Sequence, residues 1–284
     1  MIQPVIAKRD VTKHILKRFD IRMSKKLGQN FLIDEGIVNG IVSAANIKEG
    51  ETVLEIGPGI GTLTQGLAEA GAKVVAVELD SRLLEVLKQT LGGYENVRVV
   101  HGDILKVDVA KEVESEKFKV VANLPYYITT PIIMGLIEQR LPIELLVTMV
   151  QKEVALRMVA SPGGKDYGAL SVSVQYFTKA EIMFDVPPNS FMPPPGVDSA
   201  VIRCILRDKP AVEVMDEKMF FRVVKAAFSQ RRKTLNNALK TMGIAGDKIA
   251  LALEAAGVDG MRRGETLALE EFAAIADAMV KQPG

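Results

Sequence analysis

Short apolar runs alternate with helix-like stretches from about residue 51 to residue 204, and this alternation limits the fold more than any other feature of the chain. The runs are too apolar for strands with one face in water, so we expect them to be buried on both faces in a parallel sheet. Strands that alternate with helices in this way are typical of a doubly wound α/β domain. The expected strands are 52–56, 73–77, 97–100, 118–122 and 143–150, and the expected helices lie near 62–70, 81–91 and 131–140.

The chain changes character in its last third. Two further β-rich runs, at 169–184 and 199–206, flank a loop at 187–196 that contains five prolines, and such a long loop is often functional. After residue 208 the pattern is helical only, with two apolar stripes. The stripes are Phe220, Val223, Val224 and Ala227, and Leu235, Leu239 and Met242. We therefore predict a basic N-terminal extension at 1–24, an α/β domain at 25–207 and a small all-helical domain at 208–284.

The residues that build disulfides and metal sites are scarce. Cys204 is the only cysteine, which rules out an intramolecular disulfide and a thiolate cluster and fits a reducing compartment. His14 and His101 lie far apart, which argues against a His-rich metal site. No apolar run approaches the ~18 residues of a membrane-spanning helix, and the N-terminus becomes charged at Lys8, too early for a signal peptide. We expect a cytoplasmic protein that binds neither a metal nor a membrane.

The net charge of +1 conceals an uneven distribution. Residues 8–26 hold eight Lys and Arg against two Asp and Glu, whereas residues 27–186 hold 14 basic and 21 acidic residues. Between residues 219 and 246 there are six basic residues and no acidic one. An acidic body with basic segments at its periphery indicates a polyanionic partner, although solvated helix faces would also account for it.

A glycine loop with Gly57, Gly59 and Gly61 follows the first expected strand and opens a helix. The spacing is G-x-G-x-G, whereas a dinucleotide-binding loop requires G-x-G-x-x-G. Glu55, just before the loop, would repel a pyrophosphate but suits a ligand that carries an ammonium group. S-adenosylmethionine (SAM) is such a ligand.

Two further carboxylates end the next two expected strands. Glu78 lies where a carboxylate can accept both ribose hydroxyls, and Asp103 lies where one can accept from the adenine amino group. Either residue alone would be read as a helix cap. Together with the glycine loop they predict a SAM site at the carboxyl edge of the sheet.

The tetrapeptide Asn123-Leu124-Pro125-Tyr126 follows the fourth expected strand. The exocyclic amine of a base is a poor nucleophile, because its lone pair is delocalised into the ring. The Asn123 side-chain oxygen and the Leu124 carbonyl can accept its two N–H groups and favour a more tetrahedral nitrogen. Pro125 restricts Leu124 to an extended conformation, and Tyr126 can stack on the base. After a SAM-type loop, this motif favours an amino-methyltransferase over a simple strand-ending turn.

With these motifs in place, the sequence resembles the ribosomal RNA adenine N6,N6-dimethyltransferases that act on the bacterial small subunit. The resemblance runs from residue 26 to about residue 239. It rests on the motifs at 27–32, 55–62, 77–80, 101–103, 123–126, 150–153, 186–199 and 228–235. It implies a SAM-dependent enzyme that dimethylates two adjacent adenosines in a hairpin loop near the 3′ end of 16S rRNA, with a role in subunit biogenesis. The first 22 or so residues are longer than in many members of the family.

The resemblance also implies roles for residues that composition alone does not single out. Asn30 and Leu32 would join Gly57, Glu78, Asp103 and Asn123 around SAM. Phe191, in the proline-rich loop, would stack on the adenine face opposite Tyr126; the alternative is a loop residue packed in the core.

An RNA substrate would account for the basic segments. Arg231, Arg232 and Lys233 lie near the start of an expected helix, where cations oppose the helix dipole unless phosphate binds there. Lys25 and Lys26 would contact the same strand. We expect 16S rRNA in the small subunit as the partner of a monomeric enzyme.

Four alternatives remain at this point. The erythromycin-resistance type of large-subunit rRNA dimethyltransferase shares the fold and an Asn-x-Pro-Tyr motif, but the 228–235 stretch and the proline-rich loop favour the small-subunit enzyme. A DNA adenine methyltransferase would carry a separate target-recognition domain. A ribosome-assembly factor without activity would not need Asn123, Tyr126 and Glu78. A nicotinamide-dependent dehydrogenase is disfavoured by the glycine spacing.

Overall fold

The computed structural model describes residues 4–22 and 28–282. The chain forms two compact units. The first contains Met1–Ala155 and Glu181–Leu206, and the second contains Leu156–Ala180 and Arg207–Gly284. Among the described residues, none of the helices has the length and apolar character needed to cross a bilayer.

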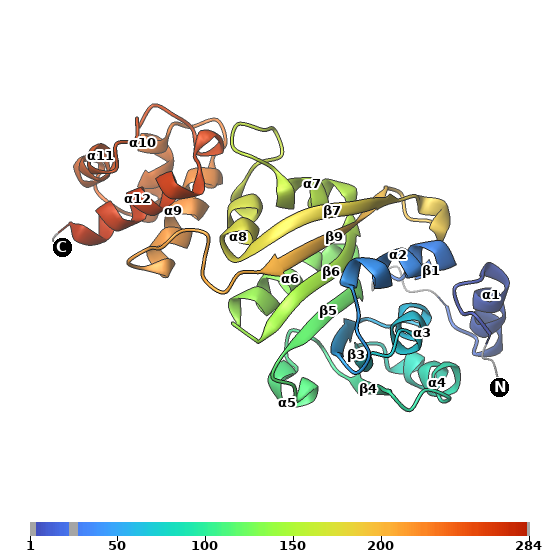
Figure 1. The fold of residues 1–284 in the computed structure, drawn as a ribbon. Coiled ribbons are helices and arrows are strands. Elements are labelled where there is room, and N and C mark those ends of the chain that lie inside the picture. The colour runs from blue at the N-terminus through green and yellow to red at the C-terminus, as the bar shows by residue number, and fades with distance from the viewer. Residues whose placement is uncertain (1–3, 23–27, 283–284) are drawn as a thin grey trace. The chain divides into compact units, whose positions relative to one another are not determined.

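A seven-stranded sheet has the strand order β4-β3-β2-β5-β6-β9-β7 (Figure 1). Five strands are parallel: β2 (Thr52–Ile56), β3 (Lys73–Glu78), β4 (Val97–His101), β5 (Phe118–Asn123) and β6 (Ile143–Gln151). These are the five expected strands, to within a residue at their ends. The sheet continues with β9 (Ser199–Leu206), antiparallel to β6, and β7 (Thr178–Val186). The expected doubly wound α/β fold is confirmed.

The helices of the first unit include the three expected between the strands, near 62–70, 81–91 and 131–140, and others that the sequence did not predict. They are α1 (Arg9–Arg18), α2 (Glu35–Ala45), α3 (Thr62–Glu69), α4 (Ser81–Thr90), α5 (Val109–Val113), η2 (Tyr126–Ile128) and α6 (Thr129–Glu138). A buried cluster joins α2 and α3 to one face of the sheet, with Ile41 and Leu67 against Val53, Val121 and Val147.

Most of the strand-to-helix loops in this unit end in an aspartate that caps the helix. Asp34, Asp80 and Asp108 each accept a hydrogen bond from a main-chain N–H in the first turn of α2, α4 and α5. Two helices of this unit that follow strands lack such a cap: α6 begins after Ile128, and α3 begins after Gly61, whose φ is 94°. The N–H groups at the start of α3 are therefore left for another partner.

Two expectations about strands were wrong. Val97–His101 is partly exposed rather than buried on both faces, because β4 lies at the edge of the sheet. The run at 169–184 is not all strand: its first part forms α8 (Ala169–Phe177), followed by β7. The alternation of serine with valine there looks like a strand, but Ser171 is buried and accepts a hydrogen bond from the N–H of Gly168, while Tyr176 packs on Phe220 of α9 (Glu217–Ser229).

The second unit is helical apart from the start of β7. It contains the second half of α7 (Lys152–Val159), α8, α9 (Glu217–Ser229), α10 (Leu235–Ala238), η4 (Leu239–Met242), α11 (Gly246–Ala255), η5 (Gly264–Thr266) and α12 (Leu269–Lys281). The predicted stripe of α9 is buried, as are Leu235 and Leu239 of the second stripe.

This unit begins earlier in the chain than the predicted boundary at residue 208, because residues 156–180 pack with the C-terminal helices. The rings of Tyr176 and Phe220 stack at 4.8 Å between centroids, and Tyr167 meets Phe228 edge-on at 5.8 Å. The aromatic contacts of α8 with α9 are long-range, so no local pattern marks this boundary.

The proline-rich loop is ordered against the first unit. It contains η3 (Pro188–Ser190) and β8 (Phe191–Met192), and β8 pairs with β1 (Phe31–Leu32) in a two-stranded antiparallel sheet. The loop also joins α2, because the hydroxyl of Ser190 donates to Asp34 Oδ2 at 2.9 Å.

Candidate functional site

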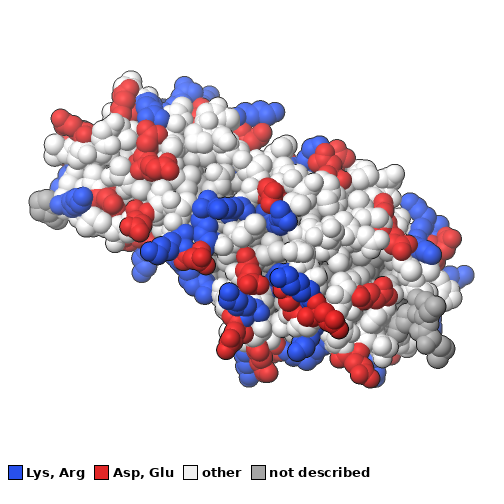
Figure 2. Space-filling view, viewed as in Figure 1, with Lys and Arg blue, Asp and Glu red and all other residues white. Residues whose placement is uncertain are grey.

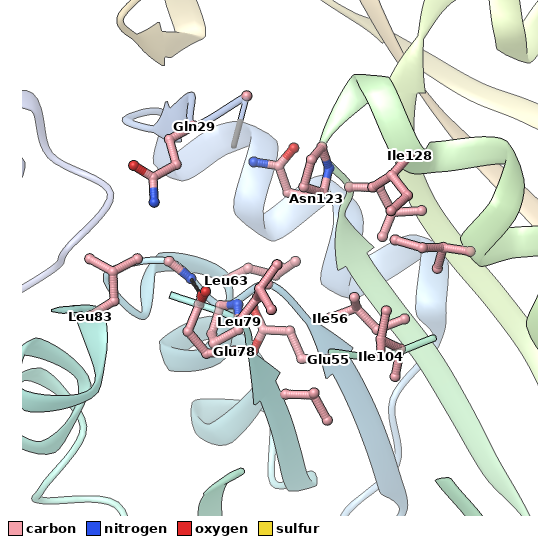
Figure 3. Close-up of a pocket in the computed structure, with 18 of the residues that line it drawn as sticks. Gln29, Glu55, Ile56, Leu63, Glu78, Leu79, Leu83, Ile104, Asn123 and Ile128 are labelled. Atoms are coloured by element: carbon pink, nitrogen blue, oxygen red, sulfur yellow. Dashed lines mark hydrogen bonds between the residues drawn. The ribbon is translucent and has the colours of Figure 1, made fainter. Parts of the chain in front are cut away.

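A cavity in the first unit opens at the carboxyl ends of the parallel strands (Figure 3). Glu55 comes from β2, Glu78 from β3 and Asn123 from β5, and residues 102–104 reach it from the loop after β4. Residues 28–32 line it from the N-terminal side. The carboxyl edge is the expected place for a ligand in an open α/β sheet.

The glycine loop forms one wall of the cavity. Gly57, Gly59 and Gly61 have φ values of 70°, 63° and 94°, a backbone conformation that favours glycine. A Cβ built on Gly57 meets nothing within 4 Å, whereas one on Gly59 approaches the ring of Phe31 at 3.3 Å. The backbone of Gly57 therefore faces open space, where a ligand can approach it closely.

The side chain of Glu78 accepts hydrogen bonds from two main-chain N–H groups, one of them in the glycine loop. Its Oε2 accepts from the N–H of Gly59 at 3.1 Å, and its Oε1 accepts from the N–H of Asp80 at 2.7 Å. Burial raises the pKa of Glu78, against the lowering effect of these two hydrogen bonds. Each carboxylate oxygen keeps a second lone pair, so the group can also accept from a pair of hydroxyls.

Two polar groups at the cavity lack a partner among the described residues. Glu55 Oε2 and Thr62 Oγ1 are buried and form no hydrogen bond there. Burial, with a smaller contribution from the nearby charge of Glu78, raises the pKa of Glu55 to about 8. Unpaired buried polar groups are costly, so these atoms fit a ligand that brings a donor such as an amino group. The residues of the cavity therefore fit SAM: an acidic pair, an open glycine backbone and unsatisfied acceptors.

The Asn123–Tyr126 motif leaves β5 at the opposite wall. Asn123 Nδ2 donates to the main-chain oxygen of Asn30 at 3.3 Å, which leaves its Oδ1 as an acceptor. The Leu124 N–H donates to the carbonyl of Met149 on β6 at 3.3 Å. Tyr126 lines the cavity and its hydroxyl lies 2.5 Å from Ser199 Oγ, while burial raises its pKa. The ring is thus fixed by the contact of its hydroxyl with Ser199, the first residue of β9.

All six predicted cofactor residues line this one cavity: Asn30, Leu32, Gly57, Glu78, Asp103 and Asn123. Sequence reasoning missed Gln29, which also lines the cavity and whose Nε2 donates to Asp80 Oδ2 at 2.8 Å. Gln29 could have been identified from the sequence, because Gln29 and Asp80 both belong to motifs that carry the family resemblance.

Among the predicted catalytic residues, Asn123, Leu124 and Tyr126 line the cavity and Phe191 does not. Its side chain is 1% exposed and belongs to the buried core, and its Cα is paired with that of Leu32 in the β1–β8 sheet. In this arrangement the ring does not face Tyr126 across the cavity. Pairing of the loop with β1 is what places it in the core.

The predicted RNA-binding residues lie in two places. Lys25 and Lys26 fall outside the described residues. Arg231, Arg232 and Lys233 are exposed, in the turn between α9 and α10. The guanidinium of Arg231 donates to the carbonyl oxygens of Lys165 and Tyr167 within the second unit, so it also has a structural role.

Fold and cavity together define a Rossmann-like SAM-dependent methyltransferase. A family model described as ribosomal RNA adenine dimethylase matches residues 21–281, and the chain belongs to this family. It is 50% identical over 278 residues to the ribosomal RNA small subunit methyltransferase A of Alkaliphilus oremlandii, which covers 95% of this chain and 96% of the relative. The expected family and its use of SAM are confirmed.

Two solved structures resemble the model over most of its length. A dimethyladenosine transferase from Plasmodium falciparum has a TM-score of 0.73 and 31% identity, covering 86% of this chain and 95% of the other. The 23S rRNA methyltransferase ErmE has a TM-score of 0.67 and 28% identity, covering 89% and 100%. The chain is 50% identical to the small-subunit relative and 28% identical to ErmE. This difference agrees with the motifs that favour the small-subunit enzyme.

Proposed function

We propose that the chain transfers methyl groups from SAM to N6 of two adjacent adenosines in the hairpin loop near the 3′ end of 16S rRNA. The observation that carries the proposal is the placement of Asn123, whose free Oδ1 lies at the cavity that Glu78 and the glycine loop also line. The name of the small-subunit relative supports the choice of RNA.

The cofactor, when bound, supplies an activated methyl group, and the residues of the chain position the amine that receives it. Asn123 Oδ1 and the Leu124 carbonyl accept the two N–H groups and favour a tetrahedral nitrogen. Tyr126, fixed through Ser199, stacks on the base. The methylated nitrogen loses its proton readily, so no strong general base is required. Catalysis is then mainly positioning.

The second unit supplies the docking surface in this proposal. Arg232 and Lys233 would bind phosphates, with Lys25 and Lys26 on the same strand. The enzyme would act as a cytoplasmic monomer during subunit biogenesis. Phe191 could stack on the adenine only after leaving the core, so Tyr126 is the principal stacking residue in the proposal.

The direct test is methyl transfer from labelled SAM to small subunits that lack the modification, with mapping of the labelled base. We expect label on two adjacent adenosines near the 3′ end, and much slower labelling with an Asn123→Ala variant. Label that maps to large-subunit RNA would support the function of ErmE instead. No label on either subunit, with SAM bound normally, would contradict the proposal and favour an assembly factor without activity.

A further inference from the structure

The segment 4–22 is hydrogen-bonded to α3, the helix that follows the glycine loop. The buried side chain of Gln65, on α3, accepts from the N–H of Ile6 at 2.8 Å and donates to the carbonyl of Pro4 at 3.2 Å. Thr12 Oγ1, on α1, donates to the carbonyl of Ile6 at 2.9 Å and so connects the turn at Ile6 to α1. Residues 4–22 are therefore part of the folded unit.

The inner face of α1 packs beside the cofactor cavity. Ile15 and Leu16 are buried in an apolar cluster with Phe31, Ile60 and Leu83. Phe31 and Leu83 also line the cavity, and Ile60 belongs to the glycine loop. The buried residues of α1 pack against the wall of the cavity. The outer face of α1 is therefore held at a fixed position near the site of reaction.

That outer face is basic. Its exposed cations are Lys8, Arg9, Lys13, Lys17 and Arg18. Arg9, Lys13 and Lys17 are spaced four residues apart and so form one row along the helix. None of the ion pairs that link described residues includes a member of this row. Figure 2 shows basic side chains at the edge of the molecule where α1 lies in Figure 1.

Helix stability does not explain this row. Lys17 and Arg18 lie in the last turn of α1, where cations interact favourably with the helix dipole. Lys8 and Arg9 lie at the opposite end, where cations are unfavourable, and Lys8 makes no capping hydrogen bond. Like charges four residues apart also repel. A bound polyanion would offset both the unfavourable interaction with the helix dipole and the repulsion between the cations, because its negative charges would contact these cations.

We propose that the outer face of α1 is a docking surface for the sugar-phosphate backbone of the RNA substrate, next to the nucleotides that enter the cavity. The inference rests on the proposed function for the identity of the polyanion. Lys and Arg side chains without aromatic neighbours on the row suit phosphates rather than bases. Fixed to the cavity wall, the row sets the register of the strand relative to the reacting base.

The test compares two triple variants of the full chain. The first is Arg9→Gln, Lys13→Gln and Lys17→Gln, which keeps good helix formers on an exposed face. The matched control is Lys48→Gln, Lys73→Gln and Lys117→Gln, at exposed positions just before or at the start of β2, β3 and β5, the opposite edge of the sheet. Binding to unmethylated small subunits is measured at several salt concentrations, together with SAM affinity and thermal unfolding.

We expect the α1 variant to bind small subunits more weakly, with a slope of log K against log salt reduced by ~2–3 units at ~0.7–0.9 per phosphate. Its SAM affinity and unfolding temperature should match the wild type, and the control should keep the wild-type slope. An unchanged slope in the α1 variant, or an equal change in the control, would overturn the proposal. If the α1 variant is unstable, the charge-conserving variant Arg9→Lys, Lys13→Arg and Lys17→Arg must retain the wild-type slope.

Failure of the proposed function would look different. In that case the wild-type chain would itself transfer no methyl group to small subunits. A reduced salt slope in the α1 variant would then still identify a phosphate-binding surface. If instead the wild type is active and the α1 variant keeps the wild-type salt slope, the docking surface is rejected and the proposed function stands.

Discussion

The side-chain amide of Asn123 donates a hydrogen bond to the main-chain carbonyl of Asn30, 93 residues earlier in the chain, at 3.3 Å. This contact fixes the rotation of the amide, because its NH2 group is used and its oxygen is not. It also joins two motifs on opposite sides of the cavity. The orientation of the oxygen that would accept from the target amine therefore depends on the 28–32 segment.

Replacing Asn123 separates chemistry from binding. Asn123→Ala should slow methyl transfer on the order of 100-fold at saturating SAM, because the acceptor matters most as the nitrogen changes geometry. RNA affinity should change little. Single-turnover transfer and equilibrium RNA binding measure the two effects. A near-normal single-turnover rate would show that Asn123 is not the acceptor.

Glu78 is expected to determine SAM affinity. Glu78→Gln removes the charge and places an NH2 group against the N–H of either Gly59 or Asp80. The loss of a charged acceptor should cost ~1.5–3 kcal/mol, or roughly 10–150-fold in affinity. Asp103→Ala should weaken binding in the same range. Calorimetry on the folded variants checks both, with the exposed Glu85→Gln on α4 as a control that should bind SAM normally.

Glu55 should make the ligand-free protein less stable as the pH rises. Its carboxyl has a pKa of about 8 when folded, raised by burial from 4.5, so between these values the unfolded chain binds fewer protons than the folded one. Stability therefore falls through this window, by an amount on the order of a few kcal/mol. Glu55→Gln should flatten this dependence. Denaturant unfolding at pH 5 and pH 8 measures it, and an equal slope in both proteins would show that Glu55 is ionised in the folded state.

Much of the site was predictable because parallel strands bring their carboxyl ends to one edge. Once 52–56, 73–77 and 118–122 are read as neighbouring parallel strands, Glu55, Glu78 and Asn123 must converge, and they do. This inference needs only hydrophobic patterning and the polar residue after each run.

The parts that were not predicted depend on contacts distant in sequence. Phe191 reads as a loop aromatic until β8 pairs with β1 and draws it into the core. Residues 169–177 alternate like a strand, but Tyr176 and Phe220 stack across 44 positions and favour a helix against α9. The anchoring of residues 4–22 depends on Gln65, a side chain with no motif to mark it.

Gln65 should stabilise the first unit through the N-terminal extension. Gln65→Ala leaves the N–H of Ile6 without its acceptor, which should lower the free energy of unfolding by ~1–3 kcal/mol. Amide exchange of Ile6 should quicken. The comparison is Tyr94→Phe, which removes a different hydrogen bond of the same side chain and leaves Ile6 paired. Protection of Ile6 that is unchanged in Gln65→Ala would show that α1 packing alone holds the extension.

The basic turn of the second unit is expected to bind RNA through two of its three cations. Arg231 contacts the carbonyl oxygens of Lys165 and Tyr167, whereas Arg232 and Lys233 are exposed at the turn before α10. Arg232→Gln with Lys233→Gln should reduce the salt slope for small-subunit binding by ~1–2 units without changing SAM affinity, at ~0.7–0.9 per phosphate. Arg231→Gln should instead lower thermal stability. Filter binding at several salt concentrations measures this slope. A double variant with the wild-type slope would mean that Arg232 and Lys233 are solvated and do not bind RNA.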